Sequence, residues 1–119
     1  RKNEIFRLYK RLLSDVEAIN ILTPNDKINP HIPFRVVLMT KEKSEGLMKY
    51  MGENGIETRT FFYPLHKQPC MKRFPQNHKL LKNSIYAYEH GVCLPSYVAL
   101  EAKQIEYVCS IIKKYYEKN

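Results

Sequence analysis

Segments with the periodicity of amphipathic helices alternate with short apolar runs along the whole of this chain. Apolar residues recur at helical spacing over residues 2–17, from Ile5 to Val16, which predicts a helix with one buried face. The run at 36–39 is almost continuously apolar, as in a strand covered on both faces, and predicts a strand over residues 34–40. A chain that changes repeatedly between these two patterns is expected to fold as an α/β sandwich, a small sheet packed by helices.

The middle of the chain predicts a second helix and a second strand. Ser44 is a suitable N-terminal cap for this helix, and Gly55 is expected to end it, because glycine tolerates the backbone conformation that follows a helix. Residues 57–62 then predict the second strand. Proline, asparagine and aspartate favour turns, which predicts loops over residues 23–30 and 67–76.

The last third of the chain predicts a helix, a strand and a closing helix. The first helix covers residues 80–88 and ends before Gly91, and a short strand over residues 92–94 follows it. The closing helix, at about residues 101–117, is expected to bury Ile105, Val108, Cys109 and Ile112. The pattern alone does not decide whether the strands pair parallel or antiparallel.

The size and composition are those of one ordinary globular domain, with 119 residues, 44% of them hydrophobic and 27% charged. No apolar run approaches the roughly 18 residues of a membrane-spanning helix. The three cysteines are odd in number and show no CxxC spacing, so they predict neither a disulfide framework nor a metal site. We expect them in or near the core of a protein from the reducing cytoplasm.

The net charge of +8 raises the question of nucleic-acid binding. The 20 basic residues are scattered along the chain and interspersed with acids, however, and most fall on the polar sides of the predicted helices. We therefore predict solvated helix faces and no nucleic-acid partner. Phosphate-binding glycine loops, HExxH pairs and GxSxG serines are also missing from the sequence. No catalytic, metal-binding or cofactor-binding residue is assigned to this chain.

Two ordered sequence blocks resemble a known enzyme family. The first, within residues 55–69, contains IETR, FFYPLH and QP; the second is GVCLPS at residues 91–96, followed by QIEYV at 104–108. Both resemble the C-terminal domain of the DegT/DnrJ/StrS family of pyridoxal-phosphate (PLP) aminotransferases, which act on nucleotide-linked keto sugars. The form FFYPxH is most similar to the GDP-perosamine synthase branch of that family. The resemblance is strongest over residues 45–114.

The resemblance implies a three- to four-stranded, mainly antiparallel sheet, as in the small domain of such enzymes. It also implies a cytoplasmic homodimer that contains PLP and transfers an amino group, from glutamate, to a keto-6-deoxy sugar for surface polysaccharides or glycosides. The family's cofactor lysine has no counterpart in this sequence. We therefore expect residues 1–119 to be the C-terminal small domain of a longer enzyme, inactive when isolated. The start at Arg1, without methionine and inside a helical pattern, fits this expectation.

The segment 55–69 also has the composition of a binding-site wall. Alternation along the predicted strand places Arg59, Phe61 and Tyr63 on one face, where a cation, a flat ring and a phenol suit a nucleotide-linked sugar. His66 follows the bend and matches the family motif, and its imidazole can hydrogen-bond sugar hydroxyls or a diphosphate. We predict that these four side chains bind the substrate.

Simpler interpretations of the same residues remain open. Arg59 could form a surface ion pair with Glu57, and Phe61 suits the core as well as the site. Phe62, on the opposite face of the predicted strand, is expected in the core. At the level of the whole protein, the alternatives are a non-catalytic basic module that binds nucleotides or RNA, with Phe61 and Tyr63 as stacking platforms, and a regulatory family member that has lost transamination.

Overall fold

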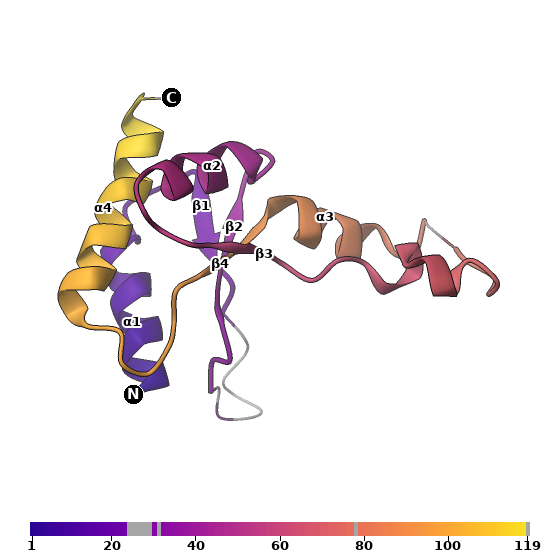
Figure 1. The fold of residues 1–119 in the computed structure, drawn as a ribbon, viewed down its shortest axis with the longest axis horizontal. Helices are drawn as coiled ribbons and strands as arrows, with labels where there is room; N and C mark the ends of the chain where they lie inside the picture. The colour runs from indigo at the N-terminus through magenta and orange to yellow at the C-terminus, as the bar shows by residue number, and fades with distance from the viewer. Residues whose placement is uncertain (24–29, 31, 78, 119) are drawn as a thin grey trace.

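The computed structural model describes residues 1–23, 30, 32–77 and 79–118 of the chain. Most of the predicted turn at 23–30 lies outside these residues. The elements, in chain order, are α1 (Lys2–Leu12), β1 (Ile19–Ile21), β2 (Val36–Thr40), α2 (Glu45–Glu53), β3 (Arg59–Thr60), the 3-10 turns Leu65–Lys67 and Pro69–Met71, α3 (Lys82–His90), β4 (Gly91–Leu94) and α4 (Ala102–Lys118) (Figure 1).

The sheet confirms the predicted class and adds a strand that the sequence pattern did not reveal. Its order is β1-β2-β4-β3, and all three pairings are antiparallel. The additional strand, β1, is only three residues long, too short for a periodic signal. It follows α1, which ends at Leu12 and not at the predicted residue 17. The Ser14 hydroxyl donates to the Arg11 carbonyl at 2.9 Å, a local bond of the kind that competes with helix continuation.

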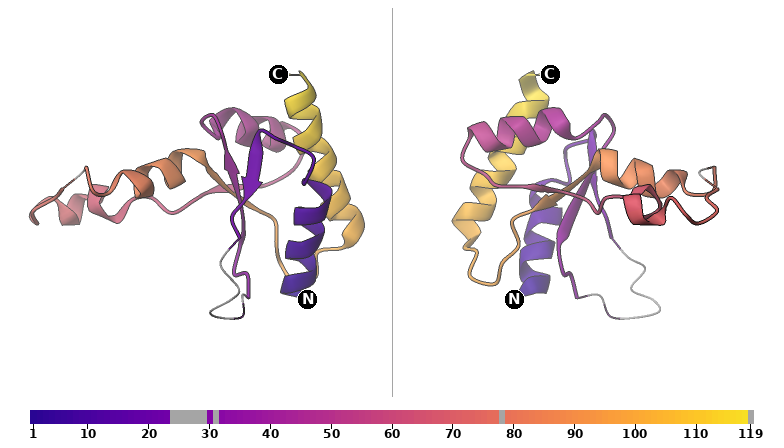
Figure 2. Two further views of the ribbon diagram at one scale, coloured as in Figure 1. Left: turned by 180° about the vertical axis from the view of Figure 1, so that it is seen from behind. Right: turned by 45° about the vertical axis from the view of Figure 1, so that its right-hand side comes forward.

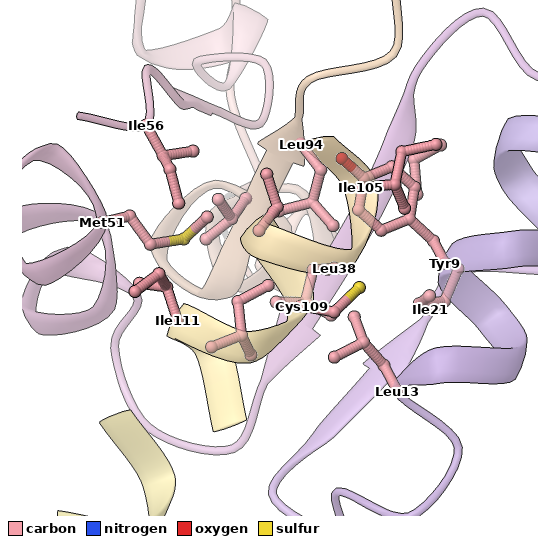
Figure 3. Packing of buried hydrophobic residues seen from close by; sticks show 14 of the residues in the cluster. Tyr9, Leu13, Ile21, Leu38, Met51, Ile56, Leu94, Ile105, Cys109 and Ile111 are labelled. Carbon is pink, nitrogen blue, oxygen red and sulfur yellow. The ribbon is translucent and has the colours of Figure 1, made fainter. Parts of the chain in front are cut away.

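One face of the sheet carries the core (Figure 3). Val36, Leu38, Val92 and Leu94 point to this face, and α1, α2 and α4 bury their apolar sides against it. The four residues of α4 predicted to be buried, Ile105, Val108, Cys109 and Ile112, are all in this cluster. The register pairs Val37 and Arg59 with the same residue, Cys93, so these three side chains share the other face.

The ends of α2 show how this helix is attached to the sheet. Ser44 precedes the helix as expected, but its side chain makes no capping bond; its Oγ donates to the Glu89 carbonyl at 3.1 Å. Tyr107 of α4 donates its hydroxyl to the Asn54 carbonyl at 3.0 Å, just beyond the other end. Tertiary contacts thus hold both ends of α2.

Residues 61–90, which we call the arm, extend away from the remainder of the domain, which we call the body (Figures 1 and 2). The arm contains the two 3-10 turns and α3, and it returns to the sheet at β4. No residue of α3 is buried. The exposed apolar side chains of the arm include Phe62, Leu65, Phe74, Leu80 and Tyr86.

The three cysteines differ in their surroundings. Cys93 and Cys109 are buried in the body, as expected, whereas Cys70 is exposed on the arm and does not belong to the core. All three are free thiols. None of the helices in the described part of the chain is both long enough and apolar enough to cross a membrane.

Candidate functional site

The chain leaves the sheet at β3, inside the segment predicted to be a binding-site wall. Gly55 has φ +75°, the left-handed conformation that glycine adopts without strain, and it lies just after α2 as expected. β3 contains only Arg59–Thr60, in place of the predicted residues 57–62. This edge strand pairs with β4 alone, and the Phe61 N–H makes one more bond to a β4 carbonyl, at 3.1 Å. Pro64 has no N–H to donate and cannot extend the ladder.

Arg59 and Phe61 lie at the point where the strand ends. The Arg59 side chain is 72% exposed and its Nη2 lies 3.6 Å from Glu57 Oε1, so the surface ion pair is formed. Phe61 is half-buried and meets the Phe62 ring edge-on, with centroids 5.3 Å apart. The prediction of Phe62 in the core is wrong, since this side chain is 60% exposed. The alternation of faces stops at Thr60, where the strand ends.

Tyr63 and His66 lie at the root of the arm. The Tyr63 ring packs edge-on against Tyr88 of α3, with centroids 5.1 Å apart, and remains 46% exposed. His66 lies in the turn Leu65–Lys67 and is only 8% exposed. The imidazole is therefore far less accessible than the other three predicted binding residues.

Three of the four predicted residues line one open hollow of about 530 Å³, which we call the arm-side hollow. They are Arg59, Phe61 and Tyr63; His66 does not contribute to its lining. The structure thus brings a cation, a ring and a phenol to one surface, as the sequence predicted for these residue types. Their role in binding remains a prediction.

Arg35 is a candidate binding residue that the sequence analysis did not identify. It lies just before β2, and its guanidinium is 5.1 Å from the Phe62 ring centroid and 5.4 Å from that of Phe34. Its Nη1 lies 3.8 Å from Cys93 Sγ. The available signal was the alternation before β2, which places Arg35 on the same face as Val37, but only the strand order brings that face to Arg59.

A second hollow, of about 630 Å³, lies between the sheet and the start of α4, and we call it the helix-side hollow. It shares Arg35 and Arg59 with the arm-side hollow. Its lining also includes seven other polar or aromatic residues: Glu57, Thr58, Ser96, Tyr97, Lys103, Gln104 and Tyr107. The two arginines therefore stand between two hollows on the same side of the body.

The described lysines lie at or near the surface. Every one of them is exposed or half-buried. No group of three or more His, Cys, Asp or Glu side chains within the described ranges could hold a metal ion.

Residues 1–113 match the model of the DegT/DnrJ/EryC1/StrS aminotransferase family. A GDP-perosamine synthase from Escherichia coli O157:H7 is 28% identical over 116 residues, which are 98% of this chain and 31% of that protein. A GDP-perosamine synthase from Vibrio cholerae is 33% identical over 72 residues, 60% of this chain and 19% of that protein.

Among solved structures, the aminotransferase TlmJ from Streptoalloteichus hindustanus superposes with a TM-score of 0.85 at 19% identity. The match covers 98% of this chain and 31% of TlmJ. The fold of this chain is thus that of one part of such aminotransferases. The chain spans less than a third of the length of each of these relatives.

Proposed function

Because the chain belongs to the DegT/DnrJ/EryC1/StrS aminotransferase family, we propose that it is the C-terminal small domain of a PLP-dependent sugar aminotransferase. The complete enzyme would transfer an amino group, from glutamate, to a keto-6-deoxy sugar carried by a nucleotide. Its products would be used for surface polysaccharides or glycosides, and it would act in the cytoplasm. The observation that carries the proposal is the family match over residues 1–113, together with two relatives named GDP-perosamine synthase.

The two domains of the enzyme would have different roles, because the described residues include candidate substrate-binding residues but no counterpart of the cofactor lysine. The family's cofactor lysine has no counterpart in this sequence, so the cofactor and its lysine would belong to the larger domain. The small domain, residues 1–119, would supply part of the substrate-binding surface. Arg59 would be directed at phosphate or carboxylate, and Phe61 and Tyr63 would lie against the sugar or the base. His66, which is buried, would support the turn that positions Tyr63.

The arm supports a subunit boundary close to this surface. Its large apolar side chains are exposed to a degree that is unusual for a finished surface, with Leu65 at 68% and Leu80 at 78%. We propose that the arm packs against the remainder of the enzyme in a homodimer whose active sites lie between subunits. Leu80→Glu in the intact enzyme should then shift the dimer toward monomers in analytical ultracentrifugation, and an unchanged dimer would contradict this part of the proposal.

Steady-state kinetics of the intact enzyme with a nucleotide-linked keto sugar test the binding role. Arg59→Gln and Tyr63→Phe should each raise the KM for the sugar nucleotide, by about tenfold for the arginine, because a charge-assisted hydrogen bond is lost. The absorbance of bound PLP should not change. Arg73→Gln, which removes an exposed cation of the arm that lines neither hollow, is the control. Wild-type kinetics for both site variants would show that the binding role is wrong.

The isolated chain provides a second, simpler test. With PLP, glutamate and a nucleotide-linked keto sugar, the 119 residues should produce no amino sugar above the uncatalysed rate. The gene sequence before the codon for Arg1 should encode the cofactor lysine. An unrelated upstream domain, or turnover by the isolated chain, would overturn the proposal.

The rival function of a nucleotide- or RNA-binding module is favoured by one observation. The arm carries both exposed aromatic rings and five exposed cations, and Arg73 lies over the Phe74 ring. The five cations are Lys67, Lys72, Arg73, Lys79 and Lys82. Fluorescence anisotropy with a labelled single-stranded RNA distinguishes the two functions. The aminotransferase proposal expects only weak binding at moderate salt, whereas submicromolar affinity that falls steeply with salt would favour the rival.

A further inference from the structure

Positive charge predominates around the helix-side hollow. Its lining includes three cations from three separate parts of the chain, Arg35, Arg59 and Lys103. Among the described residues that line it, one is an acid, Glu57. Glu57 pairs with Arg59 at 3.6 Å, but both side chains are largely exposed, and such surface pairs are weak. An incoming phosphate group can therefore replace the Glu57 carboxylate.

Arg35 is held in place before any ligand arrives. Its guanidinium stacks near the rings of Phe34 and Phe62, at 5.4 and 5.1 Å from their centroids, and its Nη1 contacts Cys93 Sγ at 3.8 Å. A guanidinium that is already positioned loses less conformational freedom on binding than a mobile side chain does. Arg35 is thus a suitable fixed anchor for an anion.

The loop 95–100, which forms one wall of the hollow, is fixed by side chains from the start of the chain. Tyr9 donates its hydroxyl to the Pro95 carbonyl at 2.9 Å. Lys2 and Arg1 donate to further carbonyls of the loop, those of Ser96, Val98 and Leu100. Four anchoring bonds give the wall a defined shape, which a binding site requires.

Two aromatic rings of the hollow are accessible. Tyr97 is 53% exposed and Tyr107 is 49% exposed, and both belong to its lining. The Tyr107 hydroxyl donates to the Asn54 carbonyl at 3.0 Å, which limits the positions of this ring. Exposed rings beside cations offer a base a surface on which to stack.

We infer that the helix-side hollow binds a nucleoside diphosphate, with the diphosphate on Arg35, Arg59 and Lys103 and the base on Tyr97 or Tyr107. The inference deepens the proposed function and rests on it, since it assigns a place to the nucleotide part of the substrate. A volume of about 630 Å³ is within the range of small-molecule sites. The sugar would then extend past Arg59 toward the arm-side hollow, which shares this arginine.

Two other hollows of similar volume, which do not include these arginines, lack the charge for such a ligand. One of them, near the end of α4, carries Lys113 against four acids, Asp15, Glu17, Glu42 and Glu117. Another, between α2 and α3, carries two lysines against three acids, Glu45, Glu57 and Glu89. Neither would attract a diphosphate.

Isothermal titration calorimetry on the 119-residue chain tests the inference with GDP, inorganic pyrophosphate and guanosine as probes. GDP should bind more tightly than pyrophosphate, and guanosine least. Arg35→Gln and Lys103→Gln should each weaken GDP binding by about tenfold, because each removes a charged donor. Tyr97→Ala should weaken the binding of GDP but not of pyrophosphate. Lys118→Gln, which removes a cation that lies over Tyr50 instead, is the control and should bind GDP normally.

Unchanged GDP affinity in Lys103→Gln and Arg35→Gln, or guanosine binding as tightly as GDP, would overturn the inference. Lys103 is exposed, so its variant carries the test if Arg35→Gln lowers the melting temperature. In the intact enzyme, Lys103→Gln should raise the KM for the sugar nucleotide. A normal KM with intact amino transfer overturns this inference alone. An intact wild-type protein without amino transfer overturns the proposed function, even if GDP binds the isolated chain.

Discussion

The body and the arm are built from similar proportions of apolar residues but use them differently. Every buried hydrophobic side chain in the described part of the chain lies in the body, where three helices cover one face of the sheet. In the arm, α3 buries no residue, and Leu80 is 78% exposed. Apolar residues with helical spacing therefore predict a helix in both regions, but they predict a core only where a second layer is present.

The comparison also indicates where the partner surfaces of this domain lie. The body buries a large apolar core, although Ile32, Phe34 and Val98 are exposed on it, whereas α3 of the arm buries no residue. The two candidate hollows lie on the body where the arm begins, and they share Arg35 and Arg59. A surface for the substrate and a surface for the remainder of the enzyme are thus adjacent.

The largest predicted difference between the regions concerns the truncation of leucines. Leu38→Ala, at a side chain with 0% exposure, should lower the free energy of unfolding by about 2–5 kcal/mol through lost burial and a cavity. Leu80→Ala in the arm should change it by about 0.5 kcal/mol or less. Urea denaturation followed by circular dichroism measures both, and equal losses would show that the arm has a core of its own.

The junction of body and arm should tolerate a methyl group poorly. A Cβ on Gly91 would lie 2.4 Å from the Ala87 carbonyl oxygen and 2.7 Å from Phe61 Cβ. Gly91→Ala should therefore destabilise the domain by about 1–3 kcal/mol. Gly52→Ala is the matched control, since a Cβ there meets nothing within 4 Å and alanine favours the helix. A neutral Gly91→Ala in thermal melts would mean that the arm moves freely at this junction.

Removal of a phenol hydroxyl should have a smaller effect that again depends on the region. Tyr9→Phe removes the bond to the Pro95 carbonyl and should cost about 1 kcal/mol, because that carbonyl loses its donor inside the body. Tyr86→Phe, on the 51% exposed ring that stacks with His90, should leave stability unchanged. Chemical denaturation of both variants is the measurement. A similar effect at both positions would contradict the distinction.

Replacement of the exposed thiol should have the smallest effect on stability. The reaction rates of the thiols should nevertheless differ between the arm and the body. Cys70 on the arm should react rapidly with a disulfide reagent at pH 8, and Cys70→Ser should leave stability unchanged. Burial raises the pKa of the Cys109 thiol from 9.0 to about 12, so Cys109 stays protonated and unreactive until the body unfolds. Rapid labelling of Cys109 in the folded chain would show that the body opens locally.

The same pKa shift gives the sign of a pH dependence. The unfolded chain releases the Cys109 proton above about pH 9, whereas the folded chain keeps it until about pH 12. Stability from this group is complete below pH 9 and declines as the pH rises from 9 to 12. Burial also raises the pKa of Tyr9, which adds to the decline at alkaline pH. A Cys109→Ala variant should show a weaker decline.

The errors in the sequence-based predictions concern places where distant segments decide the structure. The periodicity of α4 was sufficient to identify four of its five buried residues, all except Ile111, because the core face of a long helix is a local property of the sequence. The observed strand, Arg59–Thr60, is shorter than the predicted strand at 57–62, because an edge strand continues only while its neighbour provides carbonyl and N–H groups for hydrogen bonds. The sequence did not predict Arg35 as a binding residue, because the strand order that places it near Arg59 is set by pairing across the sheet.

The sequence by itself determined the class of fold, the closing helix and its core, and the family, through two motif blocks whose residues lie close together along the chain. Only the tertiary structure decided that residues 61–90 leave the body, that His66 is buried, and that Arg35 joins Arg59 and Lys103 around one hollow. The physical reason is range. Helical periodicity and turn chemistry act over a few residues, whereas burial and the convergence of charges depend on which segments the antiparallel sheet brings together.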